Sequence, residues 1–255
     1  MTTSPDAAAF FGDWVALYDA RYDERSADGH ALRARMEVVL GLLGRGPGAV
    51  LDAGMGPGRL GAELAARGWT VSGVDAAEEM VEVARKRLAE AAERLVHAEL
   101  ESLPFPDASF DAVAATGVLE YVRVAPALRE LRRVLRPGGL AVVSYPNPHA
   151  LYGVWKSRAW YPAVRSAKRL LRRPGAAFPR GGAPVPPEHF AQLLAEAGLS
   201  LGTIAHASYL VVPTPLDLAA PALSARIGER VEGAGGSYRA RLLATQVVYA
   251  ARNLG

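Results

Sequence analysis

A short glycine-rich segment between two acidic residues has the spacing of a cofactor site. Gly54, Gly56 and Gly58 follow an apolar run that contains Asp52, and Asp75 ends a second apolar run 21 residues after Gly54. Glycine lets the backbone adopt positive φ and approach a ligand closely, because no Cβ is in the way. A carboxylate at the end of the second strand, as Asp75 would be, can accept hydrogen bonds from both hydroxyls of a ribose.

The spacing of these glycines argues against a dinucleotide site. The GxGxxG fingerprint would need glycine at position 59, which is Arg59. Asp52 would also repel a pyrophosphate, whereas it would attract an ammonium or sulfonium group. The segment therefore predicts a site for a nucleoside that carries positive charge, and a tight turn followed by an unrelated aspartate is the alternative.

A sheet whose strands alternate with helices must position these residues. Apolar runs predict strands over 49–53, 70–74, 94–98, 110–115 and 140–145, and helical periodicity predicts helices over 10–44, 59–67, 77–92 and 125–135. Such alternation gives βαβ units and a parallel sheet, with ligands at the carboxyl ends of the strands. The alternation stops after Pro146. A helix over 187–197, strands over 201–212 and 244–251, and a helix over 217–231 are expected beyond it.

The composition is that of an ordinary globular protein. The chain has 255 residues, of which 50% are apolar and 22% are charged. It has no cysteine, which excludes disulfides, cysteine-ligated zinc, iron–sulfur clusters and thiol catalysis. It has no apolar run of about 18 residues, and its first residues lack the basic and apolar regions of a signal peptide. The expected compartment is the cytoplasm.

Four motifs in series give the chain a family resemblance. Over roughly residues 45–146 it resembles the class I S-adenosylmethionine-dependent methyltransferases, and it looks closest to their small-molecule and ubiquinone-type group. The resemblance implies an α/β, Rossmann-like fold: a seven-stranded, mostly parallel sheet with helices on both faces. It also implies an N-terminal helical cap over 1–45 and a catalytic domain over 46–147 and 188–255. The motifs are Val50–Gly58, Val74–Met80, Leu103–Asp111 and Leu135–Gly139.

The resemblance implies S-adenosylmethionine as cosubstrate and a set of residues that contact it. The glycine segment would pass beneath the methionine and ribose portions, with Asp52 linked to the ammonium group through water or an amide. Asp75 would hold the ribose and Glu99 the adenine amino group, and Tyr18 of the N-terminal helix would fold over the cofactor. The full set is Tyr18, Asp52, Gly54, Gly56, Gly58, Asp75, Ala76, Met80, Glu99, Leu100 and Thr116.

The acceptor side of the site is less defined. Methyl transfer needs alignment and a place for the acceptor's proton. His149 follows the fifth strand and has a side chain of suitable ordinary pKa, about 6.5, so we predict it as a catalytic residue together with Tyr18. A solvent-facing loop histidine is the alternative. Some ubiquinone-type O-methyltransferases carry a Glu-x-x-x-Glu-His run after the fourth strand, which can bind a metal ion. The matching residues here are Thr116, Glu120 and Tyr121, so only Glu120 matches and no metal is predicted.

Residues 151–187 hold eight Lys or Arg side chains and no acid. Within residues 151–173 the aromatic residues gather at 152–161 and most of the bases at 165–173, so a uniform amphipathic stripe is absent. We predict that residues 148–187 form an inserted lid over an aromatic or anionic acceptor. Peripheral contact with a lipid interface and a plain solvated insertion stay open as alternatives, and a nucleic-acid surface is the least favoured.

The predicted function is methyl transfer from S-adenosylmethionine to an oxygen or nitrogen of a small-molecule acceptor by a monomer or homodimer. A lipid-interface methyltransferase and a non-catalytic S-adenosylmethionine-binding scaffold are alternatives, because the glycine segment reports binding and not chemistry. An NAD(P)-dependent oxidoreductase is disfavoured by Arg59. Arg33 or Arg35 could pair with the cofactor carboxylate, although the sequence favours a surface position for both.

Overall fold

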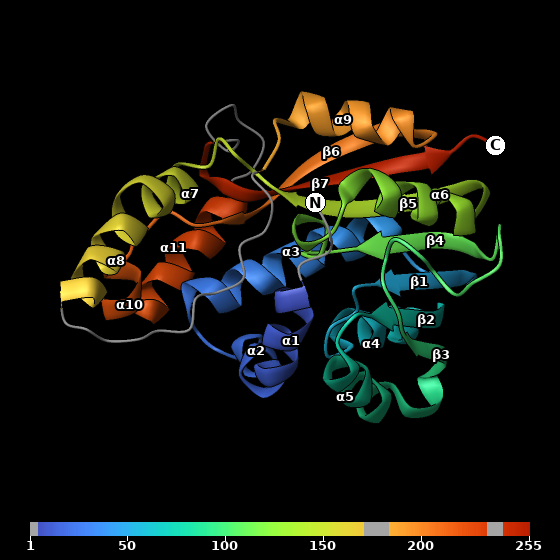
Figure 1. Cartoon of the computed structure of the whole chain (residues 1–255), viewed down its shortest axis with the longest axis horizontal. Helices are drawn as coiled ribbons and strands as arrows, with labels where there is room; N and C mark the ends of the chain where they lie inside the picture. The colour runs from blue at the N-terminus through green and yellow to red at the C-terminus, as the bar shows by residue number, and fades with distance from the viewer. Residues whose placement is uncertain (1–4, 171–183, 234–241) are drawn as a thin grey trace.

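The computed structural model describes residues 5–170, 184–233 and 242–255 (Figure 1). A seven-stranded sheet with the order β3-β2-β1-β4-β5-β7-β6 forms its centre. Only β7 runs antiparallel to its neighbours β5 and β6, so the sheet is mostly parallel, as predicted. The strands are β1 (Ala49–Ala53), β2 (Thr70–Asp75), β3 (Ala92–His97), β4 (Phe110–Ala115), β5 (Leu135–Pro146), β6 (Leu199–Tyr209) and β7 (Ala244–Asn253).

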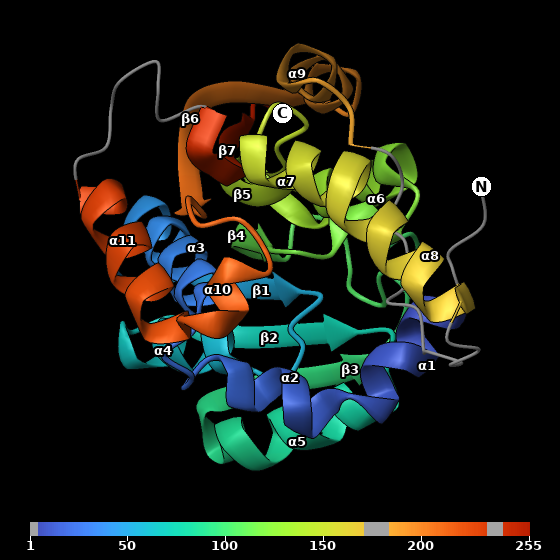
Figure 2. The ribbon, with the colours of Figure 1, turned by 90° about the vertical axis from the view of Figure 1, so that its left-hand side faces the viewer.

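Helices cover both faces of this sheet (Figure 2). Successive strand residues point to opposite faces. Leu51 therefore packs in the cluster that α6 and α9 close, whereas Val50 packs in the cluster that α3 and α4 close. The helices are α1 (Pro5–Asp13), α2 (Val15–Arg21), α3 (Ala27–Leu43), α4 (Arg59–Ala66), α5 (Glu78–Leu88), α6 (Val124–Val134), α7 (Leu151–Trp155), α8 (Tyr161–Leu170), α9 (Pro187–Glu196), α10 (Leu216–Ala219) and α11 (Pro221–Gly233).

The N-terminal region differs from the single helix predicted over 10–44. It forms three helices, and α3 begins after Ser26, whose hydroxyl accepts a hydrogen bond from the Gly29 amide at 3.1 Å. This N-cap fixes a new helix start, because Ser26 itself is extended. The helix predicted over 217–231 is also divided, into α10 and α11, where Pro221 cannot donate the backbone hydrogen bond needed to continue α10.

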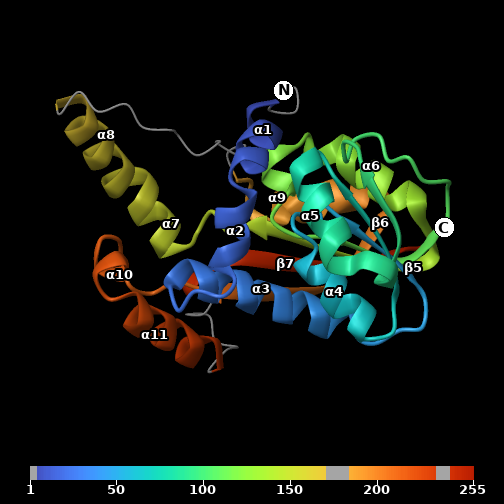
Figure 3. The same cartoon turned by 90° about the horizontal axis from the view of Figure 1, so that it is seen from below.

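The segment after β5 reaches beyond the carboxyl ends of the parallel strands. Helices α7 and α8 extend there, on the same side as α10 and α11 (Figures 1 and 3). A π-helical turn, Lys156–Trp160, joins α7 to α8. The Pro- and Gly-rich exit predicted for the lid falls within residues 171–183, which lie outside the described residues. Within the described ranges, no helix has both the length and the apolar character needed to cross a bilayer.

The glycine segment makes a tight turn between β1 and α4. The amides of Gly54 and Met55 both donate to the Val74 carbonyl of β2, at 2.8 and 3.0 Å. Gly58 precedes α4 with φ of +77°, and a Cβ there would lie 3.0 Å from the Cβ and 3.1 Å from the Cα of Ala84 in α5. Gly58 therefore meets two demands, a left-handed backbone and a close approach of two helices.

We expect Gly58→Ala to destabilise the fold by about 2–4 kcal/mol, since the new methyl group adds a clash to the backbone strain. Gly68→Ala is the matched control, because Gly68 also has positive φ, +90°, but a Cβ there meets nothing within 4 Å. The control should cost only about 1 kcal/mol. Urea unfolding of both variants measures the difference, and equal losses of stability would show that α4 and α5 tolerate the methyl group.

Two carboxylates lie close together at the ends of β1 and β2. Asp52 is 1% exposed, and its Oδ2 atom has no hydrogen-bond partner in the described part of the chain. Burial, and next the charge of Asp75, raise the pKa of Asp52 to about 7, against the opposing effect of the Gly61 amide. Burial also raises the pKa of Asp75. The folded chain therefore holds carboxylate charge where that charge is unfavourable.

The raised pKa of Asp52 should make stability depend on pH in a defined direction. Between pH 4 and 7 the folded state binds more protons at Asp52 than the unfolded state, so this group's contribution falls as pH rises through about 7. Asp52→Asn removes the titration. We expect the variant to gain stability relative to the wild type by an amount on the order of a few kcal/mol between pH 5 and pH 8. Urea unfolding at both pH values measures this gain, and parallel stability curves would contradict it.

Candidate active site

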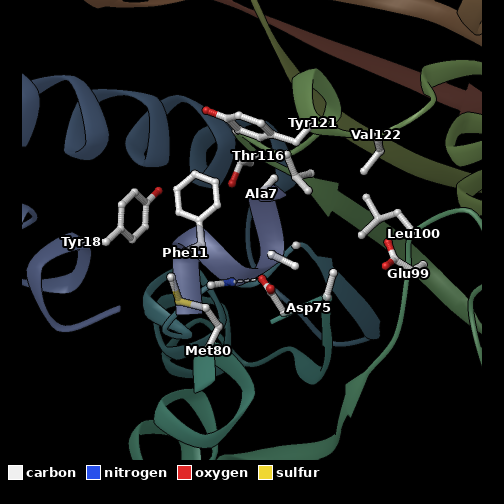
Figure 4. Close-up of a pocket in the computed structure, with 16 residues that line it drawn as sticks. Ala7, Phe11, Tyr18, Asp75, Met80, Glu99, Leu100, Thr116, Tyr121 and Val122 are labelled. Carbon is white, nitrogen blue, oxygen red and sulfur yellow. Dashed lines mark hydrogen bonds between the residues drawn. The ribbon is translucent and has the colours of Figure 1, made fainter. Parts of the chain in front are cut away.

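A narrow cavity of about 100 Å³ lies at the carboxyl ends of β1, β2 and β4, between the glycine segment and α1 (Figure 4). Its wall brings together residues that are far apart in the sequence. Nine of the eleven predicted cofactor contacts belong to it: Tyr18, Gly54, Gly56, Asp75, Ala76, Met80, Glu99, Leu100 and Thr116.

Asp75 is held in place by the backbone. Its Oδ2 accepts a hydrogen bond from the Gly56 amide at 2.8 Å, and its Oδ1 accepts one from the Ala77 amide at 3.0 Å. Each carboxylate oxygen has more than one acceptor site, so both remain able to accept from a hydroxyl. The arrangement fits a diol such as a ribose, and it depends on Gly56, whose φ of +51° turns the amide toward Asp75.

Aromatic side chains form the other side of the cavity. The Phe11 ring of α1 lies 5.8 Å from the Tyr18 ring of α2 and 5.3 Å from the Tyr121 ring, and Figure 4 shows the three around the cavity. The sequence analysis did not identify Phe11, or the neighbouring α1 residues Ala7 and Ala8. The spacing of Ala7, Phe11 and Tyr18, by four and then seven residues, is the helical signal that could have found this face.

An ion-pair network places α2 above the glycine segment. Arg59 contacts Asp19 at 2.7 Å and Asp23 at 2.6 Å, and Arg87 of α5 contacts Asp19 at 2.7 Å. Arg87 also donates to the Pro57 carbonyl. Arg59, which stands where a dinucleotide fingerprint has its third glycine, thus connects α2 to the glycine segment. The connection holds the Tyr18 ring close to Gly56: a Cβ added at Gly56 would lie 3.9 Å from it.

Arg35 is buried, at 9% exposure, although the sequence favoured a surface position. Its guanidinium lies against Gly117, where a Cβ would come within 2.8 Å of Nη1. Burial lowers the pKa of this guanidinium, but the neighbouring Tyr18, Tyr22 and Glu120 side chains raise it more, so the pKa of Arg35 lies above its ordinary value. A permanent cation therefore lies against Gly117, the residue that follows Thr116 in the cavity wall.

Two predicted contacts lie outside the cavity wall. Asp52 is buried beneath the glycine segment, so it could act on a ligand through its charge or through an intervening group. Gly58 packs against Ala84 of α5 instead of facing the cavity. Its role in the described structure is to permit the turn into α4.

The predicted base His149 is exposed and belongs to none of the three cavities described in this article. Its amide donates to the Asn147 side chain at 3.0 Å. Nothing in the site geometry therefore favours a catalytic role for it. Glu120, in the 3-10 turn Leu119–Tyr121, is enclosed instead: its Oε2 is buried without a hydrogen-bond partner among the described residues, and burial raises its pKa.

A metal site was not predicted, and that prediction stays open. Within the described ranges, no three His, Cys, Asp or Glu side chains gather in a group that could hold a metal ion.

Comparison with known proteins places this geometry in a family. Residues 51–143 match the family model described as "Methyltransferase domain". A malonyl-[acyl-carrier protein] O-methyltransferase of Pseudescherichia vulneris is 35% identical over 161 residues, which cover 59% of this chain and 60% of that protein. The chain spans between 29% and 60% of the length of the curated relatives considered.

Solved structures share the fold. A methyltransferase of Thermotoga maritima, titled a possible histamine N-methyltransferase, aligns with a TM-score of 0.66 at 19% identity over 96% of this chain and 99% of that chain. A Burkholderia thailandensis 1,6-didemethyltoxoflavin-N1-methyltransferase, solved with S-adenosylhomocysteine, aligns with a TM-score of 0.59 at 20% identity over 100% and 92%. Residues 51–143 therefore match a methyltransferase domain, and the sequence relatives and solved structures support a class I S-adenosylmethionine-dependent methyltransferase with S-adenosylmethionine as cosubstrate.

Proposed function

We propose that the protein transfers the methyl group of S-adenosylmethionine to an oxygen or nitrogen of a small molecule. The observation that carries the proposal is the Asp75 carboxylate held by the amides of Gly56 and Ala77 at one side of a cavity enclosed by Phe11 and Tyr18. The structurally similar enzyme from Burkholderia thailandensis is named for methylation of 1,6-didemethyltoxoflavin, a small molecule, and this supports a small-molecule acceptor.

The residues fit the cosubstrate from end to end. Asp75 would hold the ribose hydroxyls, and Glu99 and Leu100 would face the adenine. Arg35, which lies against Gly117, would attract the methionine carboxylate. The orphaned Oδ2 of Asp52 lies beneath the same segment, and a positive charge above it would offset the cost of its burial.

The bound cosubstrate would supply a methyl group already activated on a sulfonium. The acceptor's lone pair forms the new bond to carbon while the sulfur keeps the electron pair of the bond that breaks. The chain's task is then to align the acceptor and exclude water. Phe11, Tyr18 and Tyr121 provide the apolar enclosure. Where the acceptor must lose a proton, we propose Glu120 as its recipient, because it directly precedes Tyr121 of the cofactor-cavity wall and burial raises its pKa.

Entry of the cosubstrate should require movement of α1. The cavity of about 100 Å³ is smaller than typical small-molecule sites, and Ala7, Ala8 and Phe11 of α1 form part of its wall (Figure 4). We therefore propose that the N-terminal cap, the predicted unit over 1–45, opens and closes over the cosubstrate. The predicted lid over 148–187 would act on the acceptor instead, because Lys156 and Tyr161 belong to cavities next to the cofactor cavity. The cytoplasmic location and the monomer or homodimer state stay predictions from the sequence.

The purified protein should bind S-adenosylhomocysteine and not NAD. Asp75→Ala should weaken that binding by roughly 2–4 kcal/mol, since it removes two charge-assisted hydrogen bonds of about 1.5–3 kcal/mol each before losses. Asp107→Ala is the matched control, because Asp107 is exposed and, among the described residues, forms an ion pair only with Arg133, at 2.8 Å. Isothermal titration calorimetry measures all three proteins. Binding of NAD in place of the sulfur nucleoside would end the proposal.

Turnover should survive removal of divalent metals. Of the three positions of the Glu-x-x-x-Glu-His run, only Glu120 carries a metal-binding side chain in this chain. We therefore expect methyl transfer to depend on alignment of the acceptor and not on a metal ion. The measurement is transfer of labelled methyl groups from S-adenosylmethionine to the small-molecule fraction of a cell extract, with and without EDTA. Activity lost in EDTA and restored by magnesium or zinc would contradict this expectation. Tight cosubstrate binding with no transfer to any extract would favour the scaffold alternative.

A further inference from the structure

A second cavity, here named the acceptor chamber, adjoins the cofactor cavity. It has a volume of about 460 Å³, within the range of small-molecule sites, and lies between α2, α3, the α7–α8 segment and the strands β6 and β7. Tyr18 belongs to the walls of both cavities. A molecule in the chamber would therefore meet the cofactor cavity at the Tyr18 side chain.

The chamber continues toward the surface. Arg21, Asp28, Lys156 and Tyr161 also line an outer cavity of about 670 Å³. The wall of this outer cavity includes apolar side chains, of which Leu218 is 69% exposed. The two cavities together form a route from solvent to Tyr18, and its outer part favours a ligand with an apolar portion.

The charges of the chamber do not balance. Its wall carries three cations, Arg21, Arg35 and Lys156, and one acid, Asp28. Glu120 faces Arg35, and Asp28 lies 4.0 Å from Arg21. Lys156 contacts the face of the Tyr152 ring at 4.7 Å and forms no ion pair within the described ranges, although the charge of Asp28 also acts on it. The three cations thus face two carboxylates, Asp28 and Glu120, which leaves one net positive charge for a monoanion.

Two further features belong to the chamber wall. The Oε1 atom of Gln246, on the chamber wall, is buried and has no hydrogen-bond partner in the described part of the chain, although buried acceptors are normally satisfied. Lys156 begins the π-helical turn that leads to Tyr161, and such turns frequently occur at functional sites. A ligand that carries both an anion and an N–H or O–H donor would satisfy Lys156 and Gln246 together.

Resting on the proposed methyl transfer, we propose that the acceptor is a small carboxylic acid with an apolar body. Its carboxylate pairs with Lys156, its body lies between Tyr18 and Tyr161, and a hydroxyl or amino group of the same molecule donates to Gln246. The atom to be methylated then faces Tyr18, where the chamber meets the cofactor cavity. In this arrangement Lys156 selects for a negatively charged acceptor, and the α7–α8 segment forms the outer wall of the acceptor site.

The test compares matched acids and amides on protein saturated with S-adenosylhomocysteine. The probes are 4-hydroxybenzoate, 4-hydroxyphenylacetate and 3-(4-hydroxyphenyl)propionate, each beside its uncharged primary amide, with binding followed by ligand-observed NMR. We expect at least one acid to bind about tenfold or more tightly than its amide. Lys156→Gln should remove that preference and Lys156→Arg should keep it. Lys86→Gln, on the exposed face of α5, is the control and should change nothing.

The outcomes separate this inference from the proposed function. Failure of the wild type to bind S-adenosylhomocysteine would reject the proposed function itself. Normal cosubstrate binding with no preference for any acid, or a preference that survives in Lys156→Gln, would reject the carboxylate acceptor alone. An unchanged thermal midpoint and unchanged S-adenosylhomocysteine affinity in Lys156→Gln verify that the variant is folded, so that a lost preference reports the chamber.

Discussion

The buried carboxylates at the ends of β1 and β2 are the constraint on which the rest of the site depends. Burial raises the cost of ionising both acids, and the charge of Asp75 raises it further for Asp52 in the adjacent strand. Two backbone amides, those of Gly56 and Ala77, hydrogen-bond to Asp75 and fix its orientation despite this cost. The Gly56 amide is available because glycine lets the backbone between β1 and α4 turn back on itself, whereas the Ala77 amide follows Asp75 directly. The result is a preformed negative region, which suits a ligand with an ammonium and a sulfonium group.

The N-terminal helices complete the site through long-range ion pairs. Asp19 is shared by Arg59 and Arg87, so α2 is tied at once to α4 and α5. These pairs are partly exposed, and each contributes modestly to stability. Their effect is positional: they set the Tyr18 side chain where the cofactor cavity and the acceptor chamber meet. One residue of the cap can therefore contact both ligands of a two-substrate reaction.

The sheet and the cofactor segment could be predicted because local patterns specify them. The apolar run at 110–115 is the strand β4, and Asp75 ends β2 as expected. The glycine spacing, with Arg59 at the third position, argues against a dinucleotide. The matching residues from Gly54 to Thr116 belong to one cavity because the parallel strands that carry them end at the same edge of the sheet.

The missing part of the prediction depends on contacts between residues far apart in the sequence. The break between α2 and α3 follows from the Ser26 cap, and the position of α1 follows from packing of Phe11 against Tyr121, 110 residues away. Arg35 looks like a surface residue in a helical pattern, yet Gly117 of the facing loop leaves room for its guanidinium. His149 is the opposite case. Its position after β5 suggested a place near the site, but its side chain is exposed in the structure.

Proton release on cosubstrate binding tests the central claim most directly. If the carboxylate pair forms a receptor for positive charge, a bound ammonium group should lower the pKa of the pair. Calorimetry of S-adenosylhomocysteine binding at pH 6.5, in buffers of different ionisation enthalpy, counts the protons released. The account predicts a measurable fraction of a proton released by the wild type and a smaller one by Asp52→Asn. Binding without proton release in the wild type, or with proton uptake, would contradict it.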